Sequence, residues 1–250
     1  MVVKLVDPCY SSIGVKEIAK MFLKRFHVKE HAGAAWPQRV PRLARVREDG
    51  LKVKSKAGAG VVDLRRSVDF AKGHFPGSLN VGSAGRDFAL CIGFFLSKEN
   101  ELLLVVDRAE QAQQARRELN GAGFSKIEGF IEAGRLADLH RLTQLNVFDL
   151  KSTLSRGGKP EILDVRSHVE WKANGIPRSK NIPLPQLASR VSELSLSKPL
   201  VVVCQNGYQS AVASSWLQAY GFDSVQHLLG GMDAYGTAPL NEYVEELAIL

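Results

Sequence analysis

The chain has 250 residues, a formal net charge of +7 and an ordinary globular composition, with 45% hydrophobic and 24% charged residues. This length allows a full hydrophobic core and more naturally makes two domains than one. Its three cysteines, Cys9, Cys91 and Cys204, are too few for a disulfide framework and lack zinc-site spacing, which favours a reducing cytoplasm.

The excess charge belongs to the N-terminal segment. Residues 1–60 hold 13 of the 33 Lys and Arg residues but five of the 26 acidic ones. Such a surface is compatible with an acidic partner, yet no binding motif accompanies it, so we expect a solvated face and no nucleic acid. The first apolar stretch is shorter than a signal peptide, and no run approaches the roughly 18 apolar residues of a membrane span. The sequence therefore predicts a cytoplasmic protein with no membrane partner.

Hydrophobic periodicity predicts the elements in chain order. Residues 15–26 are expected to form a helix, and residues 32–47, rich in Pro, Gly and Arg, an irregular segment. From about residue 60 a series of strand, turn, helix, strand, loop, helix and strand is expected twice. A helix over residues 145–154 opens the second series, and residues 155–160 form a loop within it.

This alternation predicts an α/β fold with two domains, each a parallel β-sheet with helices on both faces. We expect a basic segment at residues 1–50, a first domain at residues 51–141 and a second domain at residues 142–250.

An internal repeat supports the division. Residues 62–65, Val-Asp-Leu-Arg, realign on residues 163–166, Leu-Asp-Val-Arg, at an offset of 101, and the same offset brings Asn80 onto Asn181. The next apolar run ends at Asp107 in the first copy and at Cys204 in the second, at an offset of 97. Beyond the following loop the offset is 98, so the first copy has the shorter loop.

Cys204 ends an apolar run and opens the loop Cys-Gln-Asn-Gly-Tyr-Gln-Ser before a predicted helix. Unpaired amides and the helix dipole at such a turn favour an anion, so we expect a thiol pKa lowered from about 8.5 into the range of about 3.5 to 7.5. Gly207 is expected to turn the backbone, Ser210 to cap a helix over residues 211–220, and Gly221 to end it. The alternative for an isolated cysteine is a small, inert core residue.

The second copy resembles the rhodanese domain. The resemblance rests on an ordered set of motifs, namely Asp164-Val-Arg166, Glu170-Trp171, Ile176-Pro177, Asn181-Ile-Pro183, Val-Val-Val-Cys204-x-x-Gly207-x-x-Ser210, Gly221-Phe222 and Leu229-Gly-Gly231. The first copy matches through Asp63-Leu-Arg65 and Gly73-His-Phe-Pro-Gly-Ser-Leu-Asn80. Both copies are therefore identified as members of this family.

The resemblance implies a sulfurtransferase that carries sulfur as a persulfide on Cys204. It implies a loop of backbone amides, with the side chains of its residues, that holds the anion: Gln205, Asn206, Gly207, Tyr208, Gln209 and Ser210. The family often has Arg where this chain has Gln209, so a weaker reaction with thiosulfate is expected. Gly175 also replaces a usual His, and Tyr235 stands where Trp is common.

The first copy keeps His74 but has Asp107 at the cysteine position, and a carboxylate cannot carry a persulfide. We expect this copy to be noncatalytic and Cys91 to be a packed residue. A degenerate copy before an intact one resembles the C-terminal pair of fusions with a metallo-β-lactamase-like persulfide dioxygenase, as does Gly85-Arg-Asp-Phe-Ala89. No His-x-His-x-Asp-His cluster is present, so no metal and no cofactor is expected.

The leading hypothesis is sulfur transfer from thiosulfate or a small persulfide or polysulfide to a thiol or cyanide, through a Cys204 persulfide. A non-turnover persulfide carrier, or a sulfide-sensing or docking module, is the alternative, with a persulfide dioxygenase or another sulfur-handling protein as partner. A cysteine phosphatase would want a longer loop with an Arg. Asp164 and Arg166 are expected to hold the fold, Trp171 and Trp216 to lie in the core, and His168 and His227 to be surface or capping residues.

Overall fold

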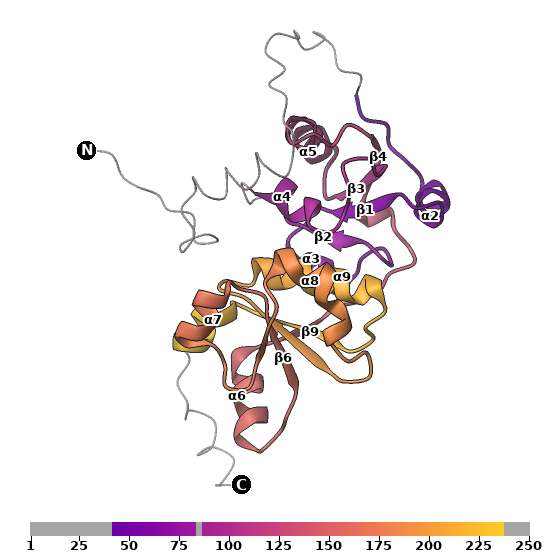
Figure 1. Cartoon of the computed structure of the whole chain (residues 1–250). Helices are drawn as coiled ribbons and strands as arrows, with labels where there is room; N and C mark the ends of the chain where they lie inside the picture. The colour runs from indigo at the N-terminus through magenta and orange to yellow at the C-terminus, as the bar shows by residue number, and fades with distance from the viewer. Residues whose placement is uncertain (1–41, 84–86, 238–250) are drawn as a thin grey trace, which may run out of the picture. The chain divides into compact units, whose positions relative to one another are not determined.

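Nine strands form among the residues that the computed structural model describes, which are 42–83 and 87–237, and the central ones come from apolar runs (Figure 1). The helix predicted over residues 15–26 lies outside this range. Every strand pair is parallel. Central strands such as β3 (Leu102–Val106) and β8 (Leu200–Val203) are buried along their whole length, because helices cover both faces of a parallel sheet.

The first sheet lies in residues 43–141, which we call the N-terminal half. Its strand order is β2-β1-β3-β4. The strands are β1 (Gly60–Asp63), β2 (Leu79–Asn80), β3 and β4 (Ile127–Glu132). Arg45 adds one parallel bridge beside Phe130 of β4. The helices of this half are α2 (Glu48–Lys56), α3 (Ser67–Lys72), α4 (Phe88–Gly93) and α5 (Ala109–Gly121), with a 3-10 turn, η1 (Ala133–Arg135).

The second sheet lies in residues 142–237, the C-terminal half, with the order β5-β9-β8-β6-β7. The strands are β5 (Thr143–Leu145), β6 (Glu161–Asp164), β7 (Lys180–Asn181), β8 and β9 (Val225–Leu228). The helices are α6 (Val147–Ser155), α7 (His168–Asn174), α8 (Leu187–Arg190), α9 (Tyr208–Tyr220) and α10 (Gly231–Thr237), with the 3-10 turns η2 (Leu184–Gln186) and η3 (Val191–Glu193). The predicted α/β class with parallel sheets flanked by helices is confirmed.

The two sheets share a strand order once β5 is set aside, since β2-β1-β3-β4 corresponds to β7-β6-β8-β9. The same side-chain contacts also occur twice. Asp63 pairs with Arg65, and Asp164 pairs with Arg166. The amides of Asn80 and Asn181 each donate to the backbone carbonyls of the corresponding Asp and Arg. The residues that realign in the sequence therefore make matching contacts in the two halves.

One boundary differs from the sequence prediction. Leu145 does not begin a helix, because it ends β5, an edge strand of three residues that pairs with β9. Helix α6 begins at Val147, and the side chain of Asn146 caps it by accepting from the Asp149 amide at 2.8 Å. The segment predicted to be irregular through residue 47 does give way to helix α2 at Glu48.

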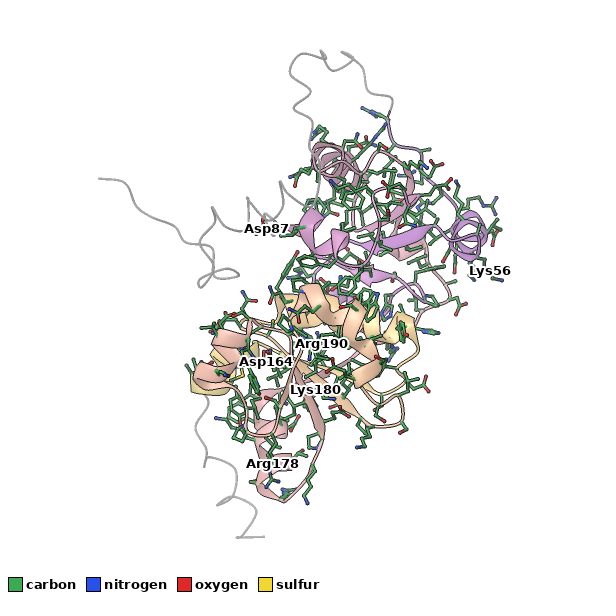
Figure 2. The ribbon with its side chains drawn as sticks, viewed as in Figure 1. Lys56, Asp87, Asp164, Arg178, Lys180 and Arg190 are labelled. Atoms are coloured by element: carbon green, nitrogen blue, oxygen red, sulfur yellow. The ribbon has the colours of Figure 1, made fainter. Side chains whose placement is uncertain are left out.

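The core is continuous across the two halves, because one cluster of buried side chains includes members such as Val62, Phe70, Leu104, Leu163 and Val202. Smaller clusters lie on the other face of each sheet. Charged side chains such as Lys56 and Arg178 are exposed, whereas Asp164 is fully buried inside the C-terminal half (Figure 2). A buried carboxylate needs a partner, and Arg166 supplies it.

Candidate functional site

Cys204 follows the last residue of β8, at the carboxyl edge of the second sheet. The loop after it turns at Gly207, whose φ of +94° is the left-handed conformation that glycine accepts at low cost. Helix α9 then runs from Tyr208 to Tyr220 and ends at Gly221, which has φ of +112°. The roles predicted for the two glycines are confirmed.

The role predicted for Ser210 as the helix cap is wrong. Helix α9 begins at Tyr208, two residues earlier, and Gly207 occupies the cap position. Ser210 instead lies in the first turn of the helix, fully buried, with its hydroxyl facing Cys204. The left-handed conformation of Gly207 turns the backbone directly before Tyr208, so the helix begins at that residue.

The sulfur of Cys204 lies inside the loop and is surrounded by hydrogen-bonding groups. The Gly207 amide donates to Sγ at 3.2 Å, and the Ser210 hydroxyl lies 3.3 Å from Sγ. The backbone amides of Asn206 and Ser210 also favour negative charge at the sulfur. The loop therefore forms a cradle for an anion at this position.

Burial raises the pKa of the Cys204 thiol, although the Ser210 hydroxyl and the loop amides oppose this rise. Only 1% of the residue is exposed. The sequence prediction of a lowered thiol pKa is therefore wrong for this structure, because loss of hydration outweighs the helix amides. The thiol form of Cys204 is the resting form at neutral pH.

The prediction that His227 is a surface or capping residue is wrong, because this residue is buried and forms part of the site. It lies on β9 beside the Cys204 strand, it is 1% exposed, and its Nδ1 lies 3.0 Å from the Ser210 hydroxyl oxygen. Burial lowers its pKa to about 4, so the imidazole is neutral at physiological pH. Its place on an inward-facing position of a strand was the available signal. His168, by contrast, is exposed, as predicted.

The side chains of Asn206, Tyr208 and Gln209 have different surroundings. Asn206 is exposed, and its side-chain oxygen accepts from the Tyr208 amide at 3.1 Å. The Tyr208 hydroxyl donates to the Gly82 carbonyl of the N-terminal half at 3.1 Å. Gln209 lies half-buried in the first turn of α9. The groups that contact the sulfur are thus backbone amides and one hydroxyl, without a cationic side chain among the described loop residues.

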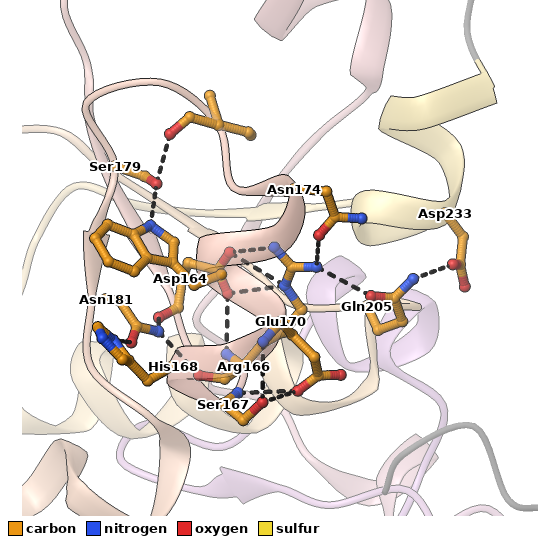
Figure 3. A network of polar contacts seen from close by, with 12 residues as sticks. Asp164, Arg166, Ser167, His168, Glu170, Asn174, Ser179, Asn181, Gln205 and Asp233 are labelled. Carbon is orange, nitrogen blue, oxygen red and sulfur yellow. Dashed lines mark hydrogen bonds and ion pairs between the residues drawn. The ribbon is translucent and has the colours of Figure 1, made fainter. Parts of the chain in front are cut away.

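Gln205 connects the loop to a buried arginine, as Figure 3 shows. The Arg166 guanidinium binds the Asp164 carboxylate with its Nε and Nη2 atoms, while Nη1 donates to Asn174 at 2.8 Å and to Gln205 at 3.1 Å. The Gln205 amide in turn donates to Asp233 of α10. Arg166 therefore holds the fold, as predicted, and also fixes the residue next to Cys204.

The start of α10 is hydrogen-bonded to the backbone of the Cys204 loop. The Met232 amide donates to the Cys204 carbonyl at 2.8 Å, and the Asp233 amide donates to the Gln205 carbonyl at 2.9 Å. This approach requires glycine at position 231, because a Cβ there would lie 2.2 Å from the Cys204 carbonyl oxygen. The Gly-Gly motif at positions 230 and 231 thus belongs to the Cys204 loop.

The corresponding loop of the N-terminal half is built differently. Asp107 is exposed, and the side-chain oxygen of Gln111 accepts from the Asp107 amide at 3.0 Å and from the Arg108 amide at 2.9 Å. These two amides are thereby occupied by the chain itself. Cys91 lies in α4 and is buried in the core of this half, in agreement with the packing role expected for it.

The two tryptophans expected in the core are only half-buried. The indole nitrogen of Trp171 donates to Ser179 at 2.9 Å, and Trp216 stacks on Phe95 with ring centroids 5.0 Å apart. At position 175, where the family often has His, a Cβ would lie 2.6 Å from Trp171, so the indole occupies this space.

Within residues 42–83 and 87–237, no three His, Cys, Asp or Glu side chains gather in a way that would hold a metal ion. Over the same residues, the helices are all too short or too polar to cross a membrane.

Comparison with known proteins identifies the C-terminal half. The family model described as "Rhodanese-like domain" matches residues 149–238. Thiosulfate sulfurtransferase GlpE of Pseudomonas syringae is 34% identical over 84 residues, which cover 34% of this chain and 79% of that protein. Adenylyltransferase and sulfurtransferase MOCS3 of Arabidopsis thaliana is 29% identical over 145 residues, 52% of this chain and 31% of that protein.

Among solved structures, a rhodanese-like domain protein from Staphylococcus aureus is 27% identical, with a TM-score of 0.37, and the match covers 38% of this chain and 92% of that one. The chain thus spans less than a third of the Arabidopsis relative but most of the Pseudomonas relative. Its relatives include sulfurtransferases. The chain belongs to the rhodanese-like family, through a rhodanese-like domain in residues 149–238.

Proposed function

We propose that the chain is a sulfurtransferase that moves sulfane sulfur through a persulfide on Cys204. The observation that supports this most strongly is the placement of the Cys204 sulfur inside a loop that directs the Gly207 amide and the Ser210 hydroxyl at it. Backbone amides and a hydroxyl stabilise a sulfur anion wherever it forms in such a loop. The family membership of residues 149–238 agrees with this chemistry.

The reaction is a double displacement. Cys204 loses its thiol proton to solvent, and the thiolate attacks the outer sulfur of a donor of the form R–S–S⁻. The new bond joins Cys204 to that sulfur, while the donor's S–S bond breaks and R–S⁻ leaves. With thiosulfate, the leaving group is sulfite. An acceptor thiolate or cyanide then attacks the terminal sulfur of the persulfide and releases the Cys204 thiolate, so the protein returns unchanged.

A small persulfide or polysulfide is the donor that the loop favours over thiosulfate. Thiosulfate carries two negative charges, and Gln209 occupies the position of a common family Arg. A charge-assisted hydrogen bond contributes about 1.5 to 3 kcal/mol, so its absence weakens the binding of a dianion most. A persulfide with a single negative charge depends less on that contact.

The N-terminal half is a noncatalytic rhodanese-like copy in this proposal. Its support is the matching strand order, the repeated Asp-Arg-Asn contacts and the Asp107 carboxylate at the position of Cys204. The Gln111 side chain already accepts from the Asp107 and Arg108 amides, so the chain itself occupies these two amides. We assign this half a supporting role, since α9 contacts it through Tyr208 and Gln218.

The test is to incubate the purified chain with glutathione persulfide or with thiosulfate and to measure its mass before and after reduction. We expect a reducible gain of one sulfur on the Cys204 peptide, larger with glutathione persulfide, followed by transfer to added thiol or cyanide. Cys204→Ser should abolish the gain, while Cys91→Ser, a matched buried cysteine, should keep it. No gain with either donor, or a gain that survives Cys204→Ser, would show the proposal to be wrong.

A persulfide carrier is the second candidate, and the 1% exposure of Cys204 favours it, because a protein partner would have to open or reshape the loop. In that case a persulfide dioxygenase or another sulfur-handling protein would be the donor. The same mass measurement separates the two: loading by a small donor with turnover supports the enzyme, and loading only by a persulfidated protein, without turnover, supports the carrier.

A further inference from the structure

His227 is a buried imidazole that the reaction steps above do not use. It lies on β9, and its backbone pairs with Val202 of β8, the strand that leads to Cys204. Its Nδ1 lies 3.0 Å from the oxygen of Ser210, whose hydroxyl lies 3.3 Å from the Cys204 sulfur. The Cys204 sulfur, the Ser210 hydroxyl and the His227 imidazole are therefore connected in series by hydrogen bonds.

The imidazole carries a single ring hydrogen at neutral pH, because burial lowers the pKa of His227 to about 4. This hydrogen can sit on Nδ1 or on Nε2, and the group bonded to Nδ1 decides which form the protein favours. Here that group is the Ser210 hydroxyl, which has one hydrogen to donate and two lone pairs that accept.

Ser210 has three neighbours for these bonds. They are the Cys204 sulfur at 3.3 Å, the Gly207 carbonyl at 3.2 Å and the His227 Nδ1 at 3.0 Å. With hydrogen on Nδ1, the Ser210 hydroxyl makes all three hydrogen bonds in the resting state. The thiol and the imidazole both donate to the Ser210 oxygen, and the Ser210 hydroxyl donates to the Gly207 carbonyl.

Ionisation of the thiol then requires only one rotation. The Ser210 hydrogen turns from the Gly207 carbonyl to the sulfur anion, the imidazole still donates to Ser210, and the carbonyl keeps its bond from the Ala211 amide at 3.2 Å. With hydrogen on Nε2 instead, the same rotation would leave the Nδ1 lone pair facing a lone pair of Ser210. The first form is the one that suits an anionic sulfur.

We propose that His227 is a positioning residue, whose Nδ1–H donates to Ser210 and so directs the Ser210 hydroxyl toward the Cys204 sulfur when that sulfur is a thiolate or persulfide. The inference rests on the proposed sulfur chemistry and deepens it. It predicts a specific form of one ring, which can be observed without any sulfur donor.

The direct test is nitrogen NMR of the full chain labelled with ¹⁵N-histidine at neutral pH, with His227→Asn used to assign the signals of the ring. We expect hydrogen on Nδ1 and a bare Nε2. The opposite pattern, with hydrogen on Nε2, would overturn the inference. The position of the ring hydrogen is read from the unmodified protein, and His227→Asn serves only to assign the signals.

The second test measures how fast iodoacetamide alkylates the Cys204 peptide as a function of pH. His227→Leu should raise the apparent thiol pKa by about one unit and slow alkylation about tenfold below that pKa. His227→Asn, which places an amide N–H near the position of Nδ1, should restore the rate to within about twofold of wild type. In a Ser210→Ala background, His227→Leu should add nothing, because the residue acts through Ser210.

His168→Leu is the control. His168 is exposed on α7, and its ring contacts Asn181 rather than the Cys204 loop. This variant should leave the alkylation profile unchanged. An unchanged profile in His227→Leu, or an effect that persists without the Ser210 hydroxyl, would show the inference to be wrong. Alkylation reports the thiolate alone, so a failure of sulfur loading in the mass experiment would be a separate result.

Discussion

The hydroxyl of Tyr208 donates a hydrogen bond to the backbone carbonyl of Gly82 at 3.1 Å, so a residue of the Cys204 loop contacts the N-terminal half. Other residues of α9 also contact the N-terminal half. The Ser215 hydroxyl accepts from the Asn80 amide at 2.8 Å, and the Gln218 side chain contacts His74 and the Arg141 carbonyl. The helix that carries the proposed sulfur cradle is thus held by both halves.

Removing the Tyr208 hydroxyl should therefore weaken this anchorage. Tyr208→Phe keeps the ring but leaves the Gly82 carbonyl without this donor, and we expect the free energy of unfolding to fall by about 1 kcal/mol. Urea unfolding measures the change. Tyr220→Phe is the control, because Tyr220 is exposed and should change stability by less than about 0.5 kcal/mol. Equal losses in both variants would contradict the anchoring role.

A cation placed in the loop should change the preferred donor. Gln209→Arg restores the residue type common at this position, and we expect kcat/KM for thiosulfate to rise about tenfold or more, with a smaller gain for glutathione persulfide. Steady-state assays with both donors test this. Gln114→Arg, on the exposed face of α5, gives the same charge change away from the loop and should have no effect. A uniform gain for both donors would mean that the added charge acts only by general attraction.

The backbone of the loop should tolerate no side chain at position 231. A Cβ on Gly231 would overlap the Cys204 carbonyl oxygen, and its φ of +56° is a conformation that alanine adopts at a cost. We expect Gly231→Ala to lower the free energy of unfolding by about 3 kcal/mol or more and to slow persulfide loading. Gly236→Ala, five residues later with open space around it, should be neutral or slightly stabilising. Thermal unfolding of both variants tests the contrast.

The sequence predicted the features that recur along the chain, such as the alternating strands and helices. It missed features that depend on individual contacts in the folded protein. Alternating apolar runs and the two Asp-x-Arg motifs indicated the α/β class, because periodicity and burial act over many residues at once. The edge strand β5 has only three residues, two of them half-buried and one exposed, so no apolar run marked it. The thiol pKa depends on burial from all sides, which a loop motif does not specify. His227 became visible only when the register placed it beside β8.

Acid should unfold the chain partly through two histidines. The pKa values of His74 and His227 are lowered from 6.5 to about 4 by burial, so the unfolded state binds protons more readily than the folded state between these pH values. Their contribution to stability is full above about pH 6.5 and is lost as the pH falls to about 4, by about 3 kcal/mol for each residue. Carboxylates also titrate in this pH range, so the contribution of each histidine is read from the difference between a variant and wild type.

The measurement is urea unfolding from pH 7 to pH 4 for wild type, His74→Gln and His227→Asn. Each variant lacks one imidazole, and we expect its stability to fall less steeply with acid than that of wild type. If the three proteins lose stability in parallel, neither histidine is held neutral by the fold.

The two buried arginines allow a test of what connects the fold to the site. Arg65 and Arg166 each bind the Asp two residues before them, but Arg65 also donates to the Gly73 carbonyl, whereas Arg166 donates to Gln205 beside Cys204. Lysine keeps the charge and loses the planar fork, so Arg65→Lys and Arg166→Lys should each destabilise the fold by about 2 to 3 kcal/mol.

Only Arg166→Lys should alter Cys204 itself, because only that change releases Gln205 and lets the loop amides move relative to the sulfur. At a temperature where both variants remain folded, we expect persulfide loading to slow about tenfold in Arg166→Lys and by less than twofold in Arg65→Lys. Equal slowing would assign the effect to general loss of stability. Unequal slowing at equal stability would show that a fold-holding arginine also positions the loop, a role that its counterpart in the N-terminal half does not share.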